Sequence, residues 1–276
     1  MRARDRPGLV GPRAARRTTL RGARSGPRRS DVAPRAYNGA MKPSGARAPF
    51  VTPRIRTRTP ASTGRPSRAR PRQPAATRDL DALLAAVRAC RACEAHLPLG
   101  PRPVLQAGAD ARLLVVGQAP GAKVHASGVP WDDASGERLR DWLGIDKATF
   151  YDAAQVAIVP MGFCYPGRGR GGDLPPRREC AALWLDRLLA QMPHIELTLL
   201  IGRYAQRHFL GTRARPSLTG TVAAFADYAP RTIPLPHPSP RNTAWFQRHP
   251  WFAAELLPVV RDRVRTVLAP GDAGLP

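Results

Sequence analysis

The chain has 276 residues, and its hydrophobic content of 43% is enough to bury one sizeable core. Its formal net charge is +24, but residues 1 to 78 hold 21 basic residues against only two acidic ones. No stretch reaches the roughly 20 apolar residues that a membrane span needs, and the apolar run of a secretory signal is also missing. We therefore expect a soluble, cytoplasmic protein without a membrane partner.

Residues 1 to 78 are rich in Arg, Pro, Gly and Ser and show no sustained hydrophobic period. Such a segment cannot bury enough apolar surface to offset the loss of chain entropy, which predicts a disordered tail. Its arginines would attract nucleic-acid phosphates; a transit-like leader, or translation from upstream of the true start, is the alternative. We expect one domain over residues 79 to 268 and a short tail over 269 to 276.

Helical and strand patterns alternate along the predicted domain. Apolar residues at helical spacing predict helices from Asp79 toward Cys90 and at 136–143, 177–191, 203–210 and 251–267. Short apolar runs predict buried strands at 112–116, 156–159, 197–201 and 232–236. This alternation indicates an α/β fold, namely a three-layer α/β/α sandwich around a central, mainly parallel four-stranded sheet.

Two loops follow predicted strands, at the edge where ligands of open parallel sheets collect. The first is Gly117-Gln118-Ala119-Pro120-Gly121, and a segment reading Gly128-Val129-Pro130-Trp131-Asp132-Asp133 comes soon after it. The second is His237-Pro238-Ser239-Pro240-Arg241-Asn242. Taken alone, the first loop is weak evidence, because glycines serve any sharp turn and the Gly-Lys-Ser/Thr ending of a phosphate loop is missing.

The four cysteines of the chain are Cys90, Cys93, Cys164 and Cys180. The first two form a C-x2-C pair, the third lies 71 positions after Cys93, and the fourth lies 16 positions further on. A disulfide framework is not expected in a reducing cytosol. The residues themselves leave three interpretations open: small core hydrophobes, a tetrahedral zinc site, or an iron-sulfur cluster.

Together, the two loops resemble those of the uracil-DNA glycosylase superfamily, which pairs a G-x-x-P-G loop after the first strand with an H-P-S loop after the last. The segment HPSPRN resembles that of the single-strand-selective uracil glycosylases. The cysteine spacing resembles that of the iron-sulfur, family 4-like uracil-DNA glycosylases of bacteria and archaea. The resemblance covers nearly all of residues 79 to 268, and it implies a structural [4Fe-4S] cluster on the four cysteines, with zinc as the alternative.

The resemblance implies a monofunctional, base-flipping DNA repair glycosylase that hydrolyses the N-glycosidic bond of uracil or another deaminated base. Trp131 would stack on the flipped base. His237 would donate a hydrogen bond to the carbonyl oxygen that collects negative charge as the base leaves. The site would be completed by Gly117, Ala119, Pro120, Gly121, Ser239, Arg241 and Asn242. We expect a monomer whose partner is DNA.

Two departures from the family pattern bear on catalysis. The iron-sulfur relatives carry Glu where this chain has Gln118, and an Asn that reads the uracil edge where this chain has Pro160. Asp132 or its neighbour Asp133 is the candidate substitute for the missing carboxylate, although either could instead be a surface charge or cap the following helix. Base identity would then be read by Gln118, by main-chain groups near residues 161 to 163, or not strictly at all. These departures favour an alternative function: a catalytically weak or inactive DNA-binding, damage-sensing protein.

Overall fold

The structure is a computed structural model that describes residues 75 to 270. Most of the predicted N-terminal tail therefore lies outside the described residues, as does most of the predicted C-terminal tail. The first helix, α1 (Ala75–Arg88), starts four residues before the predicted domain boundary at Asp79.

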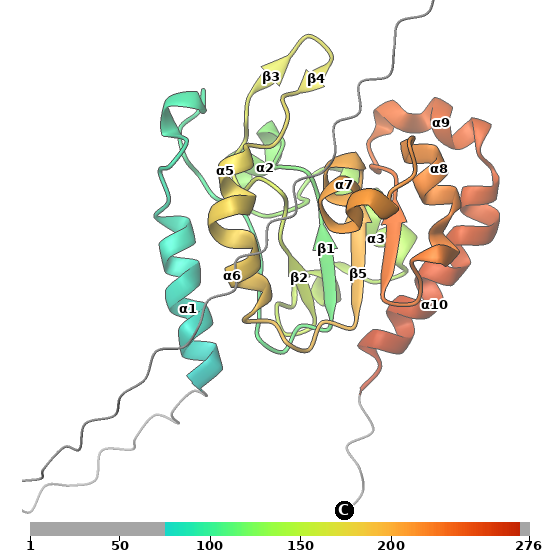
Figure 1. Ribbon diagram of the computed structural model, residues 1–276, viewed down its shortest axis with the longest axis horizontal. Helices are drawn as coiled ribbons and strands as arrows, with labels where there is room; N and C mark the ends of the chain where they lie inside the picture. Colours follow the sequence, from blue (N-terminus) through green and yellow to red (C-terminus); the bar gives the residue numbers. More distant parts are fainter. Residues whose placement is uncertain (1–74, 271–276) are drawn as a thin grey trace, which may run out of the picture. The chain divides into compact units, whose positions relative to one another are not determined.

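The centre of the fold is a four-stranded parallel sheet (Figure 1). Its strands are β1 (Leu113–Val116), β2 (Val156–Ile158), β5 (Leu197–Ile201) and β6 (Thr232–Leu235). They lie in the order β2-β1-β5-β6, and every neighbouring pair is parallel. The predicted apolar runs thus form strands that are buried on both faces, as a parallel sheet between helices requires.

Alternate side chains of each strand enter different cores, which gives the fold three layers. Leu114 and Val116 of β1 pack with α1, α6 (Asp186–Leu189) and α7 (Arg203–Leu210). Leu113 and Val115 pack with α3 (Ala134–Leu143), α8 (Leu218–Ala223) and α10 (Leu257–Leu268). The prediction of an α/β/α sandwich is confirmed.

Two of the predicted long helices contain a wider turn. The segment predicted at 177–191 consists of α5 (Arg178–Cys180), a π-helical turn (Ala181–Leu185) and α6. A second π-helical turn (Phe252–Leu256) comes before α10. Hydrophobic periodicity locates a helix but does not show its hydrogen-bond register, so the pattern could not reveal these turns.

Several short elements were not predicted, because two to six residues are too few to show a period. They include the hairpin of β3 (Arg168–Gly169) and β4 (Gly172–Asp173). The short α-helices among them are α2 (Ala122–Ser127), α4 (Lys147–Tyr151), α8 and α9 (Thr243–Arg248). Single 3-10 turns lie at Glu94–His96, Gly211–Arg213, Phe225–Asp227 and Pro240–Asn242. Within residues 75 to 270, none of the helices combines the length and apolarity needed to cross a bilayer.

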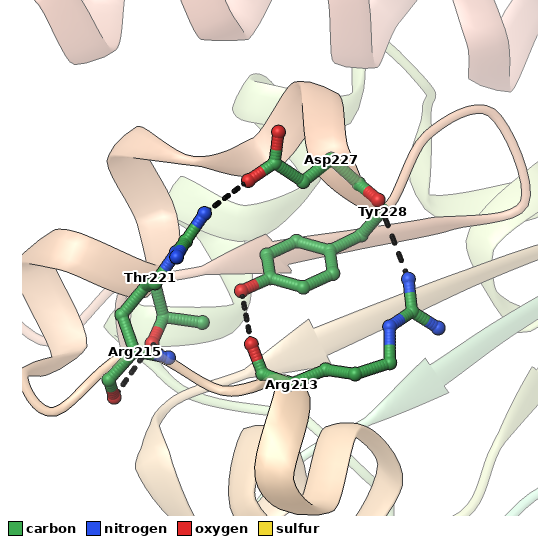
Figure 2. Close-up of polar contacts among 5 residues, drawn as sticks. All are labelled: Arg213, Arg215, Thr221, Asp227 and Tyr228. Atoms are coloured by element: carbon green, nitrogen blue, oxygen red, sulfur yellow. Dashed lines mark hydrogen bonds and ion pairs between the residues drawn. The ribbon is translucent and has the colours of Figure 1, made fainter.

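A cluster of polar contacts joins the segment after α7 to the segment that leads into β6 (Figure 2). The hydroxyl of buried Tyr228 donates to the carbonyl oxygen of Arg213 at 2.8 Å, and the Arg213 guanidinium lies over the Tyr228 ring. Arg215 forms an ion pair with Asp227, and Thr221 bonds the main chain of Arg215. Because β6 leads directly to the His237 loop, these contacts help to fix where that loop starts.

Replacing Tyr228 with phenylalanine is expected to lower the free energy of unfolding by about 1 kcal/mol, because one buried hydrogen bond is lost while the ring stays. Chemical denaturation would measure the change. Tyr204→Phe is the matched control, since its hydroxyl has no hydrogen bond to another residue between 75 and 270. An equal loss in both variants would contradict a role for the Tyr228 hydroxyl.

Candidate functional site

A cavity of about 420 Å³ opens at the carboxyl ends of the parallel strands, which is large enough for a small ligand such as a nucleobase. Among the residues proposed from sequence for catalysis or substrate binding, Asp132 and the segment 161–163 do not line it. The lining residues from the two loops are Gly117, Gln118, Ala119, Pro120, Gly121, His237, Ser239, Arg241 and Asn242, and Trp131 lies among them. The fold thus brings together two loops whose nearest ends, Gly121 and His237, lie 116 positions apart.

The hydrogen bond to His237 Nδ1 determines which ring nitrogen carries the proton. The backbone N–H of Ser239 donates to Nδ1 at 3.2 Å, so Nδ1 must keep its lone pair and the proton of the neutral ring lies on Nε2. Burial lowers the pKa of His237 from 6.5, and the charge of Asp133 offsets this effect in part. His237 is therefore a neutral imidazole that offers an N–H donor in a cavity-lining position.

Side chains from two elements hold the His237 loop in place. The amide of Asn242 donates to the carbonyl oxygen of His237 at 2.8 Å. The guanidinium of Arg138, on α3, donates to the carbonyl oxygens of Pro238 and Ser239. The Ser239 hydroxyl accepts from the N–H of Arg241. Ser239 and Asn242 thus stabilise the loop from within, and Arg138 is a loop-positioning residue that sequence reasoning missed.

Trp131 lies in the cavity wall with an unusual backbone. Its φ of 57° falls in the left-handed region, which is costly for a large side chain. Its ring centroid lies 5.5 Å from that of His237, with an angle of 34° between the planes. Its indole also lies against Gly117, and the backbone of Gly136 approaches its carbonyl group. Glycine at 117 leaves room for the Trp131 ring, and glycine at 136 leaves room for the strained Trp131 backbone.

Gly136→Ala is expected to destabilise the fold by about 1–3 kcal/mol, because the new Cβ would lie 1.7 Å from the carbonyl oxygen of Trp131. Main-chain atoms cannot move aside as a side chain can, so the Trp131 turn must shift. Denaturation curves and the fluorescence of the tryptophans would report both effects. Gly171→Ala, where nothing lies within 4 Å of the added carbon, should change stability by less than about 0.5 kcal/mol.

The main-chain donors of residues 161 to 163 are already used within the fold. Met161 N–H donates to the carbonyl oxygen of Gly117, Gly162 N–H to that of Gln118, and Phe163 N–H to the Cys180 sulfur. These three N–H groups are therefore engaged within the fold and are not free to read the base. The side chain of Gln118 lines the cavity and has no hydrogen bond to another residue within 75 to 270. Pro160 also lines the cavity.

The carboxylates near the cavity differ from the sequence expectation. Asp132 is exposed and does not line the cavity, whereas Asp133 does. Asp133, however, caps α3: its carboxylate accepts from the N–H of Gly136 at 2.9 Å. A third carboxylate, Asp173 of β4, lines the cavity and was not considered, because nothing in the sequence links residue 173 to either loop.

The four cysteines, none of which is in a disulfide, come together on the α1 side of the fold. Cys93 and Cys164 share a small buried cluster with Leu97. Burial raises the pKa of the Cys180 thiol to about 12, the Phe163 N–H opposes this effect, and negative charge on the other three cysteines adds to it. Burial likewise raises the pKa of Cys164 to about 11. The donor set is thus four thiols drawn from two distant segments.

Hydrogen-bond donors point at two of these sulfurs. Trp184 Nε1–H, in the π-helical turn, donates to Cys90 Sγ at 3.4 Å, and Phe163 N–H donates to Cys180 Sγ at 3.5 Å. In the described part, no three His, Cys, Asp or Glu side chains have the spacing that holds a metal ion. Four clustered thiols with N–H donors to sulfur nevertheless fit the chemistry of a thiolate-bound metal group.

The fold and the cavity together define the class of protein. It is an α/β/α sandwich with a parallel sheet whose strand-end loops bring an N–H-donating histidine, a tryptophan and a glutamine into one small-ligand pocket. The sequence matches the family model of the Uracil DNA glycosylase superfamily over residues 105–261, which is more than half of the chain. The chain therefore belongs to the uracil DNA glycosylase superfamily.

Proposed function

We propose that this protein is a monofunctional DNA glycosylase that excises uracil, or another deaminated base, from DNA. The observation that carries the proposal is the neutral His237, whose Nε2–H is left as a donor because the Ser239 N–H occupies Nδ1. As the glycosidic bond breaks, its electron pair leaves with the base and negative charge collects on a base carbonyl oxygen. A fixed, partly buried N–H donor stabilises that charge more than it stabilises the ground state.

Two further side chains suit a base that has been flipped out of the stack. The Trp131 ring offers an apolar face beside His237, and base-aromatic stacking contributes about 1–3 kcal/mol. The Gln118 amide has one acceptor and two donors, so it can pair with the polar edge of a pyrimidine or a purine. With Pro160 unable to donate, Gln118 is the group we expect to select the base.

We further propose that the four cysteines hold a [4Fe-4S] cluster, as in the iron-sulfur branch that the spacing resembles, with zinc as the alternative. Cys90, Cys93, Cys164 and Cys180 would be its ligands, and Trp184 and the Phe163 N–H would donate to two of the sulfurs. A bound cluster would supply a structural cross-link between the segment after α1 and the connector that follows β2. The hairpin β3–β4 lies within that connector, between Cys164 and Cys180.

The test of the enzyme proposal is incubation of the purified full chain with single- and double-stranded oligonucleotides, each carrying one uracil or one hypoxanthine. Alkali then cleaves any abasic site. We expect cleavage at the damaged position and none at an unmodified base. If no substrate is cleaved above the level of His237→Ala at any salt concentration, the chain is not a glycosylase. Tight binding to damaged DNA without cleavage would instead support the damage-sensing alternative, which the lack of a carboxylate between residues 117 and 121 favours.

A further inference from the structure

The hairpin β3–β4 forms part of the cavity wall, although it is remote in sequence from both loops. Gly171, Gly172 and Asp173 line the cavity, and Figure 1 shows the hairpin beyond the carboxyl edge of the sheet. At Gly172, where φ is 140°, an added Cβ would lie 2.8 Å from a guanidinium nitrogen of Arg241. The hairpin therefore packs closely against the His237 loop, and a glycine permits this approach.

The Asp173 side chain also reaches the first loop. Its Oδ2 lies 3.5 Å from the position that a Cβ on Gly121 would occupy. Among residues 75 to 270, no hydrogen bond or ion pair uses the Asp173 carboxylate. Asp133, the other acidic residue in the lining, is already bound to the N–H of Gly136. Asp173 is thus the carboxylate of the cavity that is left for a ligand.

The depth of each lining residue indicates which part of a nucleotide it meets. Gly117, Pro120 and Ile158 are buried and form the floor, while Arg241 and Asp173 are exposed and form the rim. A flipped nucleotide enters base first, so its sugar and phosphate remain at the rim. Asp133 is half-buried and its carboxylate caps α3, so it is not the carboxylate at the rim. Asp173 lies at the rim, where we expect the sugar.

From this geometry, and on the basis of the glycosylase function proposed above, we propose that Asp173 is a catalytic carboxylate that faces the sugar. When the C1′–N bond breaks, its electron pair leaves with the base and positive charge remains on the sugar. The Asp173 carboxylate stabilises that cation and accepts one proton from the water that forms the new C1′–O bond. The proton then passes to solvent, and the departing base anion takes a proton from solvent.

The test compares the binding of two abasic-site DNA analogues. One carries a protonated pyrrolidine in place of the deoxyribose, which imitates the cationic sugar, and the other carries a neutral tetrahydrofuran. We expect the wild-type protein to bind the cationic analogue about 10- to 100-fold more tightly, and Asp173→Asn to lose most of that preference. Binding of the neutral analogue should stay unchanged, which shows that the variant is folded and still holds DNA.

The matched control is Asp110→Asn, an exposed aspartate that precedes β1 and lies at the opposite edge of the sheet. It should keep the preference for the cation. Equal affinity of the wild type for both analogues would overturn the proposal, as would an unchanged preference in Asp173→Asn. Neither result would contradict the glycosylase proposal, which is tested by base excision in the wild type. If the wild type excises no base, the glycosylase proposal is wrong. The ratio of the affinities for the cationic and neutral analogues then still shows whether a carboxylate faces the sugar.

Discussion

Replacing His237 with alanine is expected to lower the rate of base excision by about 10²- to 10³-fold, the usual cost of removing one fixed donor to a developing anion. Binding of abasic-site DNA should change little, because the donor acts on the leaving base. Single-turnover excision would measure the rate, and a gel-shift titration the affinity. His194→Ala, an exposed histidine just before β5, is the control and should excise normally. Equal rates in the His237→Ala and wild-type proteins would contradict the assignment.

The protonation state of His237 gives a second test of the same role. Because the neutral ring is the donor, raising the pH from about 7 to about 9 should not reduce the excision rate through His237. A catalyst that worked as an imidazolium would be lost over that range. His237→Asn keeps an N–H donor at this position and is expected to retain more activity than His237→Ala. A rate that falls as the pH rises in the wild type but not in His237→Asn would contradict the assignment of a neutral, donating ring.

The lowered pKa of His237 also predicts how stability depends on pH. Burial disfavours the charged ring, so the folded state binds fewer protons than the unfolded state. The free energy of unfolding is therefore not reduced by His237 above pH 6.5, the ordinary pKa that the ring has in the unfolded chain. It decreases as the pH falls from 6.5 toward the lower pKa of the folded state. The unfolding free energy of the wild type should fall more steeply below about pH 6 than that of His237→Asn.

If the four cysteines hold the proposed cluster, replacing Cys180 with serine is expected to remove it and to lower the free energy of unfolding on the order of 4 kcal/mol or more. The reason is that the Cys164–Cys180 connector would lose its covalent tie to the segment after α1. Iron and sulfide analysis and the visible absorption would follow the cluster, and denaturation would follow stability. Excision should fall as well, because the connector carries the hairpin with Asp173.

The control for this substitution is Ala181→Ser, the neighbouring residue, which introduces the same hydroxyl without removing a thiol. It should keep the wild-type iron content and colour. A colourless wild-type protein with stoichiometric zinc would contradict the iron-sulfur assignment but leave the four ligands in place. A wild-type protein that binds neither metal would overturn the proposed site.

Sequence patterns predicted the local features of this protein better than the features that depend on distant residues. The apolar runs and helical periods predicted the four parallel strands and α7 with the correct bounds, and a cap of α3 was among the alternatives left open for Asp132 and Asp133. These features depend on residues a few positions apart, so a single sequence contains the information. The hairpin β3–β4 was not predicted, because its strands have only two residues each. The engagement of the N–H groups of residues 161 to 163 could not be predicted, because their partners lie 17 to 44 positions away.

By itself, the sequence determined the fold class, the two strand-end loops and the set of cysteines, since each is written in local pattern or spacing. Only the tertiary structure decided which atoms are available for chemistry. In the structure, Nδ1 of His237 accepts from the Ser239 N–H and Asp133 caps α3. Asp173 lies at the rim of the cavity. Whether a polar group is free for a ligand depends on the partner that folding gives it, and such partners come from segments that no local pattern connects.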